Sequence, residues 1–131
     1  MLILEILNNW VILNYMDSRL ETSYLIYHLH FFFNLEELPE VNKIHGKVTN
    51  QLSHIAKIFP LLLRPAGPLP KPMFMLEFSE DVIQKIIFFF KEYQESYSIF
   101  IHPELDDELL AHTYHSIWLG KQIQLRLEYL T

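Results

Sequence analysis

Five of the seven histidines are the residues of this chain whose type and spacing could do chemistry. His102, His112 and His115 fall within fourteen residues, and a second pair, His28 and His30, lies in an apolar run nearer the start of the chain. Neutral imidazole is a common ligand of zinc and of non-haem iron(II). The pattern therefore predicts a metal site assembled from two distant parts of the sequence.

Composition limits the other ligands and the partners. The chain has 131 residues and no cysteine, so any metal must be held by nitrogen and oxygen atoms. Half of the residues are hydrophobic and 15% are aromatic, which is enough apolar material for one well-packed domain. The formal net charge is −6 and there is no basic stripe, so nucleic acid is not expected as a partner. A small organic molecule or another protein chain is expected instead.

The opening residues 1–15 are apolar but make a poor targeting signal. They have no basic leader and no small-residue cleavage site, and Glu5, Asn8 and Asn9 interrupt them. The run is also too short to span a bilayer, so we expect a cytoplasmic protein with no membrane segment. We divide the chain into an extension, residues 1–22, and one domain, residues 23–131. The extension either packs on the domain or on a partner, or reflects a start codon upstream of Met16.

A strand is predicted over residues 23–33, which are rich in Tyr, Ile, Leu and Phe and end at Asn34. Successive side chains of a strand point to opposite faces. His28 and His30 therefore share one face, whereas the other face is apolar and is expected to contact the core.

The middle of the chain alternates between helical and strand patterns. Apolar residues at three- and four-residue steps predict a helix over residues 38–55, with Pro39 in its first turn. A short strand is expected at residues 58–63, before a loop at residues 64–72 whose four prolines exclude regular structure. A strand at residues 73–78, a helix at residues 80–92 capped by Ser79, and a strand at residues 96–102 follow.

Two more elements are expected at the end of the chain. Asp106 or Asp107 is suited to cap a short helix that carries His112 and His115 on one face and stops at Gly120. Residues 122–130 are predicted to form a last strand. The order is the βαββαβ pattern of a ferredoxin-like α+β sandwich with an extra C-terminal helix and strand. The first and fourth strands are neighbours in that topology, which brings the histidines of residues 28–30 near His102.

Four segments resemble the DOPA 4,5-dioxygenase family. They are YHLHFFFN at residues 27–34, RPAGPLPKPMF at residues 64–74, IHPE at residues 101–104 and HTYHSIWLG at residues 112–120. The likeness covers roughly residues 24–130, with the segments in the right order and at compatible spacings. It implies a dimeric ferredoxin-like domain that uses non-haem iron(II) and dioxygen to open the ring of a catechol such as DOPA, by extradiol cleavage. Zinc is expected only as an adventitious occupant.

The resemblance also suggests roles for the histidines. Those of the family match His30, His102 and His112, which are therefore expected to bind the metal, and a further frequent histidine matches His28. Deprotonation of a catechol calls for a base that is poised near neutral pH, and histidine suits this task. His28, His112 and His115 are the candidates for catalytic acid-base chemistry.

Charged residues supply further candidates. Arg64 and Lys71 flank the proline loop, where they are expected to bind a carboxylate of the substrate. Glu77 lies on the same side of its predicted strand as Met73 and Met75, so it is a possible carboxylate ligand of the metal. A glutamate at such a position is more often a surface residue of the strand.

Two departures from the family pattern bear on activity. Leu69 stands where the family reads histidine in Gly-Pro-His-Pro, and Leu62 stands where a histidine often precedes the loop. The resemblance as a whole supports a first hypothesis, a ring-cleaving dioxygenase. The two leucines make its activity uncertain and support a second. The alternative is a catalytically weakened, dimeric module that binds a metal or small molecule on the same fold. A third reading keeps only a structural dimer, in which the histidines are partly buried residues without a ligand.

Overall fold

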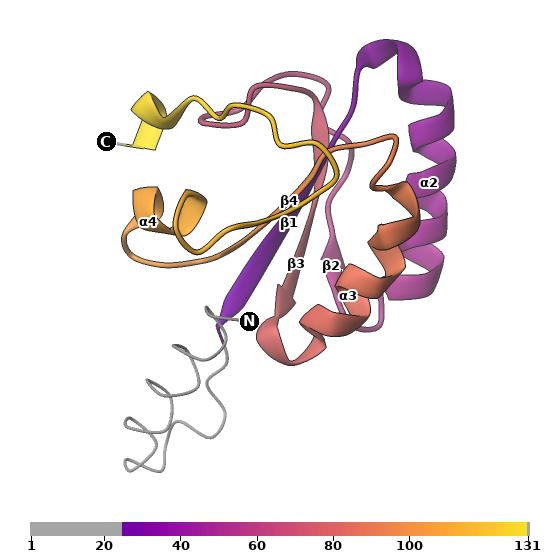
Figure 1. The fold of residues 1–131 in the computed structure, drawn as a ribbon. Coiled ribbons are helices and arrows are strands. Elements are labelled where there is room, and N and C mark those ends of the chain that lie inside the picture. The colour runs from indigo at the N-terminus through magenta and orange to yellow at the C-terminus, as the bar shows by residue number, and fades with distance from the viewer. Residues whose placement is uncertain (1–24, 131) are drawn as a thin grey trace.

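The computed structural model describes residues 25–130, so the predicted N-terminal extension, residues 1–22, lies outside the described residues. Figure 1 shows one antiparallel sheet with the two longer helices on one side and the C-terminal part of the chain on the other. The architecture is α+β and ferredoxin-like, as the order of elements predicts.

Five strands form the sheet in the order β2-β3-β1-β4-β5, and all neighbours are antiparallel. The strands are β1 (Ile26–Phe32), β2 (Lys57–Ile58), β3 (Met73–Ser79), β4 (Ile99–Pro103) and β5 (Ile117–Leu119). The first four strands have the ferredoxin-like order, and β5 is added at the edge beside β4. The predicted pairing of the first and fourth strands is confirmed.

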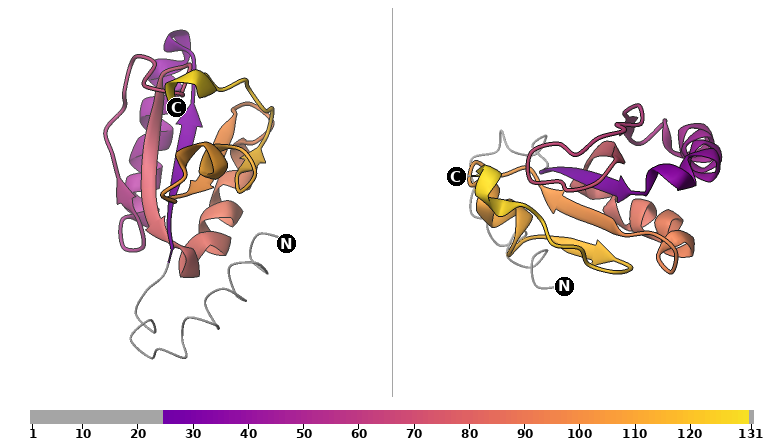
Figure 2. Two further views of the ribbon diagram at one scale, coloured as in Figure 1. Left: turned by 90° about the vertical axis from the view of Figure 1, so that its left-hand side faces the viewer. Right: turned by 90° about the horizontal axis from the view of Figure 1, so that it is seen from above.

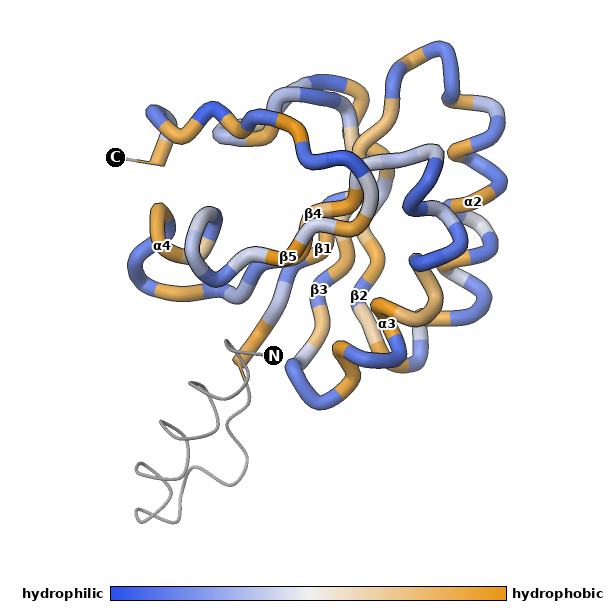
Figure 3. Tube along the Cα trace, viewed as in Figure 1, coloured by the Kyte–Doolittle hydropathy of each residue, from blue (hydrophilic) through white to orange (hydrophobic). Residues whose placement is uncertain are grey.

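The first two helices follow the predicted positions with small shifts, whereas the third is shorter than expected. They are α2 (Leu38–Leu52), α3 (Ile83–Phe90) and α4 (Glu108–His112), and the 3-10 helices are η2 (Leu35–Glu37), η3 (Glu80–Val82), η4 (Lys91–Tyr93) and η5 (Leu127–Leu130). Pro39 occupies the first turn of α2, where its missing N–H costs no helical hydrogen bond. Hydrophobic and hydrophilic residues alternate along α2 in Figure 3, as expected for a helix with one face against a core.

The larger core lies between the helices and one face of the sheet, which we call the helix face. Strand β1 contributes Leu29 and Phe31, whose side chains have no exposed surface. Val48 of α2 and Ile86 of α3 are equally buried against them. The prediction that this face of β1 is apolar and contacts the core is confirmed.

The opposite face, which we call the histidine face, has a smaller apolar cluster. Phe32, Leu69, Met73 and Phe100 are buried there, with Trp118 and residues of the C-terminal segment packed against them. Figures 1 and 2 show the C-terminal segment and α4 on this side of the sheet. The chain itself therefore covers part of this face. The homodimer implied by the family resemblance stays a prediction.

Three predicted elements near the sheet edges are wrong. The strand expected at residues 58–63 is limited to Lys57–Ile58 and an isolated bridge from Leu62 to Met73. Pro60 lies between them, and proline has no N–H to donate to a strand ladder.

The other two errors are connected. The helix expected to reach Gly120 ends at His112, and Ile117–Leu119 pairs with Ile99–Ile101 of β4 instead. Because β5 takes the free edge of β4, residues 122–130 form no strand; they cross the histidine face and end in η5. Within residues 25–130, no helix has the length and apolarity needed to cross a membrane.

Candidate metal centre

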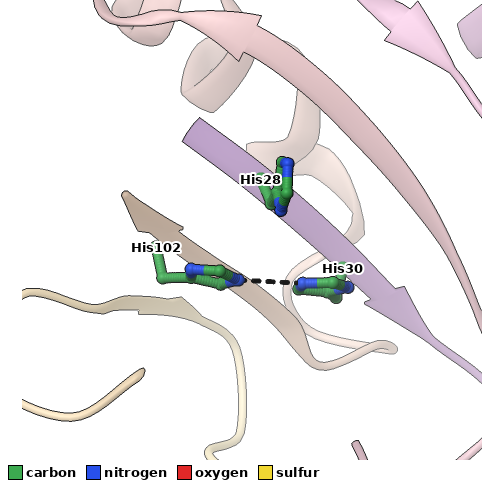
Figure 4. Close-up of side chains that lie close together, drawn as sticks. All are labelled: His28, His30 and His102. Atoms are coloured by element: carbon green, nitrogen blue, oxygen red, sulfur yellow. Dashed lines mark hydrogen bonds between the residues drawn. The ribbon is translucent and has the colours of Figure 1, made fainter. Parts of the chain in front are cut away.

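Three histidines meet on the histidine face because of the strand register. His28 and His30 are two residues apart on β1, so they point to the same side of the sheet. His28 lies directly opposite His102 of β4 in the antiparallel pair. Figure 4 shows the three imidazoles side by side above the two strands.

The positions of the nitrogen atoms fit a metal ion. One ligand atom from each of His28, His30 and His102 lies within 4.8 Å of the others. The Nε2 atoms of His30 and His102 are 3.1 Å apart. Two imidazole ligands at right angles, each with a metal bond of about 2.1 Å, would be separated by about 3 Å. These three histidines could therefore bind a metal ion.

A hydrogen bond of His102 leaves its Nε2 free to bind a metal ion. Its Nδ1–H donates to the carbonyl oxygen of Pro103 at 3.0 Å, which fixes the tautomer and leaves a lone pair on Nε2. The Nδ1 of His30 is buried without a hydrogen-bond partner among the described residues. In a neutral His30 the proton is on Nε2, which donates to the lone pair of Nε2 of His102 at 3.1 Å; a metal ion bound between the two nitrogens would take the place of this proton.

Burial also keeps two imidazoles uncharged. His30 and His102 are only 4% and 3% exposed. Loss of solvation lowers the pKa of His30 well below its usual range, and the charges of His102, His28 and His112 lower it further. Burial and then His112 lower the pKa of His102 to about 3, although its bond to Pro103 opposes the shift. Both rings are neutral near pH 7, the state in which imidazole binds metals.

His28 lies between two carboxylates at the more exposed end of the cluster. Its Nε2 is 3.0 Å from Oε2 of Glu77, and its Nδ1 is 3.6 Å from Oε1 of Glu104. Glu77 is opposite His28 in the register of β1 and β3, so it lies on the histidine face. Glu77 contacts His28 but is not one of the three residues with converging ligand atoms.

Glu104 is a residue of this site to which the sequence analysis gave no role. It follows His102 by two residues at the end of a strand, and its N–H donates to the carbonyl oxygen of Ile26 at 2.7 Å. The alternation of side chains along a strand places residues 102 and 104 on the same face. That spacing is the signal that could have identified Glu104.

His112 and His115 are placed differently from each other. The ring of His112 stacks on His102, with the centroids 3.9 Å apart, and its Nδ1–H donates to the carbonyl oxygen of Glu108 at 2.8 Å. His115 lies beyond the end of α4 and its ring contacts Tyr114. The two histidines therefore do not share a helix face, and only His112 is brought to the cluster.

The predicted contacts for a substrate carboxylate lie away from the histidines. Lys71 lines a pocket of about 260 Å³ with Phe32 and Ser96, at the opposite end of β1 from His28. Arg64 is exposed and makes no hydrogen bond or ion pair with another described residue. Their role in substrate binding stays a prediction.

Leu62 and Leu69, which stand where the family pattern has histidine, pack on the histidine face. Leu69 is 6% exposed and lies in the cluster of Phe32, Met73 and Phe100, and Leu62 packs against the same cluster. A guanidinium N–H of Arg126 donates to the carbonyl oxygens of Gly67 and Leu69, at 3.2 and 3.3 Å, and so ties the C-terminal segment to the proline loop. The loop is thereby held against the same side of the sheet as the histidines.

Comparisons with known proteins agree with the site. The model of the Dopa 4,5-dioxygenase family matches residues 27–129. A crystal structure of a candidate dioxygenase from Nostoc punctiforme is similar in fold, with a TM-score of 0.69 and 25% sequence identity over 82% of this chain and 91% of that chain. No curated protein sequence matches the chain significantly. The first two matches support a dioxygenase-like role. This chain belongs to the Dopa 4,5-dioxygenase family.

Proposed function

We propose that the chain is a non-haem iron(II) dioxygenase that opens the ring of a catechol by extradiol cleavage. The observation that carries this proposal is the convergence of His28, His30 and His102 within 4.8 Å in a chain of this family. Three neutral nitrogen ligands on one side of the metal suit iron(II), since they leave positions for a catechol and dioxygen. Bound iron would supply the activation of dioxygen, and both oxygen atoms would enter the ring-opened product.

The apolar side chains around the cluster hold the imidazoles in place. The ring of His30 stacks on Phe32 and Phe100, with centroid distances of 6.4 and 6.1 Å. Both phenylalanines are almost fully buried. Fixed rings preserve the ligand geometry, and the surrounding apolar atoms exclude water from the reacting atoms.

We assign the acid-base step to His112 and not to a fourth metal bond. The carbonyl oxygen of Glu108 can only accept, so the single proton of a neutral His112 is on Nδ1. Its Nε2 then has a lone pair that can take a proton from a catechol hydroxyl. His112 rests on the face of His102, which positions this base beside the metal ligands. His115 has no comparable contact with the cluster.

Metal analysis of single variants distinguishes these roles. We expect purified wild-type protein to bind close to one equivalent of iron(II), or of zinc when iron is absent, because the same imidazoles suit both. His30→Ala and His102→Ala should lose most of this metal. His112→Ala should keep it and should lose about a hundred- to ten-thousand-fold in turnover, the usual range for a general base.

The activity test uses iron-loaded protein with DOPA and simple catechols, in the presence and absence of oxygen. A yellow ring-opened product that forms only with oxygen is the expected result. Unchanged metal content in both His30→Ala and His102→Ala would contradict the metal site. Loss of metal in His112→Ala, with metal retained in His28→Ala, would show that His112 is the third ligand in place of His28.

A second candidate function is a catalytically weakened module that binds a metal or a small molecule. Leu69 favours it, because an apolar side chain buried beside Phe32 and Phe100 supplies no proton acceptor where the family pattern has histidine. This candidate predicts the same metal content and the same binding of catechols as the first. It differs in giving no ring-opened product.

A further inference from the structure

We propose that Glu77 and Glu104 make the open end of the histidine cluster selective for catechols that carry a positive charge. The inference rests on the proposed function, because it concerns the substrate of that site. The expectation from the sequence that Arg64 and Lys71 bind a substrate carboxylate predicts the opposite charge preference, so one experiment tests both.

Exposure increases in one direction across the site. His30 and His102 are almost fully buried, whereas the side chain of His28 is 14% exposed. The side chains of Glu77 and Glu104, on either side of His28, are 38% and 57% exposed. Solvent and ligands therefore reach the histidines at the end marked by these two carboxylates.

The two carboxylates leave this end negatively charged. His28 is the partner of both, and a single imidazole can neutralise at most one of them. Neither glutamate pairs with a lysine or arginine among the described residues. The chain then continues from Glu104 into exposed Asp106 and Asp107, which add negative charge beyond the strand end.

One basic residue of the histidine face is near the glutamates, because Lys57 lies opposite Glu77 in the register of β2 and β3. Its Nζ lies over the ring of Phe59, 4.9 Å from the centroid, and it makes no ion pair with Glu77. Lys71 and Lys121 line the same pocket beside Phe32, which is four residues, or about 13 Å, along the strand from His28. Arg126 directs a guanidinium N–H to the loop carbonyls of Gly67 and Leu69. One lysine beside two glutamates still leaves this end negatively charged.

The site runs from the buried nitrogens to the exposed carboxylates, and this orientation determines which part of a bound substrate lies near the charges. The hydroxyl groups of a catechol must reach the buried nitrogens of His30 and His102, so the substituent on the far side of the ring extends to the exposed end. A protonated amine there meets two carboxylates, and a carboxylate substituent meets repulsion. Exposed charge pairs give modest effects that salt weakens, so we expect discrimination of about tenfold at low ionic strength.

Equilibrium binding to the zinc-loaded protein tests the inference, because zinc has no redox chemistry and the ligands are not consumed. Three catechols differ in charge at the same position of the ring: dopamine, 4-ethylcatechol and 3-(3,4-dihydroxyphenyl)propanoate. Calorimetric titration should give the lowest Kd for dopamine and a Kd about tenfold higher for the propanoate, with 4-ethylcatechol between them. Glu104→Gln should reduce the ratio to about threefold, as one of two charges is removed.

Glu95→Gln is the matched control, since it removes the same charge from an exposed residue in the pocket with Lys71, at the far end of the strand. It should leave the ratio unchanged. Equal Kd values for the three ligands, tighter binding of the propanoate, or equal effects of Glu95→Gln and Glu104→Gln would overturn the charge selectivity alone. Failure of all three ligands to bind would overturn the proposed function, and this inference with it.

Discussion

The two faces of the sheet are formed by the same strands, but they differ in their side chains and in the segments that pack on them. On the helix face, β1 presents Leu29 and Phe31 to two amphipathic helices, and the buried residues of the shared cluster are aliphatic or aromatic. On the histidine face, the same strand presents His28 and His30 to loops, a five-residue helix and the C-terminal segment.

The helix face therefore mainly stabilises the fold, whereas the histidine face carries the candidate site. The helix face buries the larger apolar area and so supplies most of the hydrophobic stabilisation. The histidine face retains buried imidazoles that cost desolvation and lie next to one another. Such groups are tolerated where the rest of the fold is stable enough, which is how sites with perturbed pKa values are usually built.

Truncation of neighbouring phenylalanines, one on each face, tests most directly whether the helix face contributes more to stability. Phe31→Ala on the helix face should lower the free energy of unfolding by about 3 to 5 kcal/mol, because rigid helices cannot collapse into the cavity. Phe32→Ala should cost about 2 to 3 kcal/mol, since irregular segments around it can move inward. Urea unfolding of both variants measures the difference. A larger loss for Phe32→Ala would contradict this division.

The second prediction concerns the acid sensitivity of the histidine face in metal-free protein. Burial lowers the folded-state pKa of His30 and His102 below the ordinary value of 6.5, so the unfolded chain binds protons first as the pH falls. Stability should therefore be complete above about pH 6.5 and decrease below it. At pH 5 the loss from His102 should be about 2 kcal/mol, and His30 should add to it in the same direction.

Urea unfolding at pH 7.5 and pH 5 measures this loss, and His102→Gln is the informative variant. It should lower the pH dependence by about the 2 kcal/mol expected from His102. An identical pH dependence in wild type and His102→Gln would show that other groups control the acid response.

The third prediction concerns the junction between the faces, where β5 ends beside η4. Gly120 has φ +77°, and a Cβ there would lie 2.3 Å from the carbonyl oxygen of Gln94 and 2.4 Å from that of Tyr97. Gly120→Ala should therefore cost about 2 to 3 kcal/mol of unfolding free energy, from the backbone conformation and the backbone clash together. Gly67→Ala is the control, because Gly67 has φ +52° but no atom within 4 Å of its Cβ position.

For Gly67→Ala we expect a loss of about 1 kcal/mol, from the left-handed backbone alone. Thermal unfolding of the two variants side by side gives the difference. Equal losses would mean that the chain shifts easily at Gly120 and that β5 is not fixed against η4.

The smallest effect is expected from restoring an imidazole to the proline loop. Leu69→His should raise ring cleavage at least tenfold, or about 1.4 kcal/mol of barrier, without changing the metal content. A modest loss of stability should accompany it, because a polar ring replaces a leucine packed against Phe32 and Phe100. Brisk cleavage by the wild-type enzyme, with Leu69→His neutral or harmful, would show that an imidazole in the loop adds nothing to the acid-base role assigned to His112.

Sequence patterns predicted the fold well where one period dominated a segment. The alternation in β1 identified both of its faces, and the three- and four-residue steps identified α2 with its buried Val41 and Val48. Predictions failed where short apolar segments can form either helix or strand. Residues 117–119 were assigned to a helix, yet they pair with β4, because the open edge of that strand offers hydrogen bonds that no local pattern records.

The site residues, too, could be predicted only in part from the sequence. The sequence predicted His30, His102 and His112 as metal ligands and His28 as a base, and the strand order predicted that residues 28–30 would lie near His102. In the structure the ligand atom that converges with those of His30 and His102 is that of His28. The position of His112 depends on the path of the chain after His102, which no local pattern records. The sequence also gave no reason to connect Glu104 with Glu77, which are brought together only by the position of His28 between them.

The sequence by itself determined the residue types, the alternation of the strands and hence that His28 and His30 share one face of their strand. These properties are local, since the period of a strand or helix fixes the direction of each side chain. Only the tertiary structure decided which nitrogens converge, how deeply they are buried and where the charges of Glu77, Glu104, Arg64 and Lys71 lie relative to them. These properties depend on the register between strands and on the packing of loops, which are contacts between residues far apart in the chain.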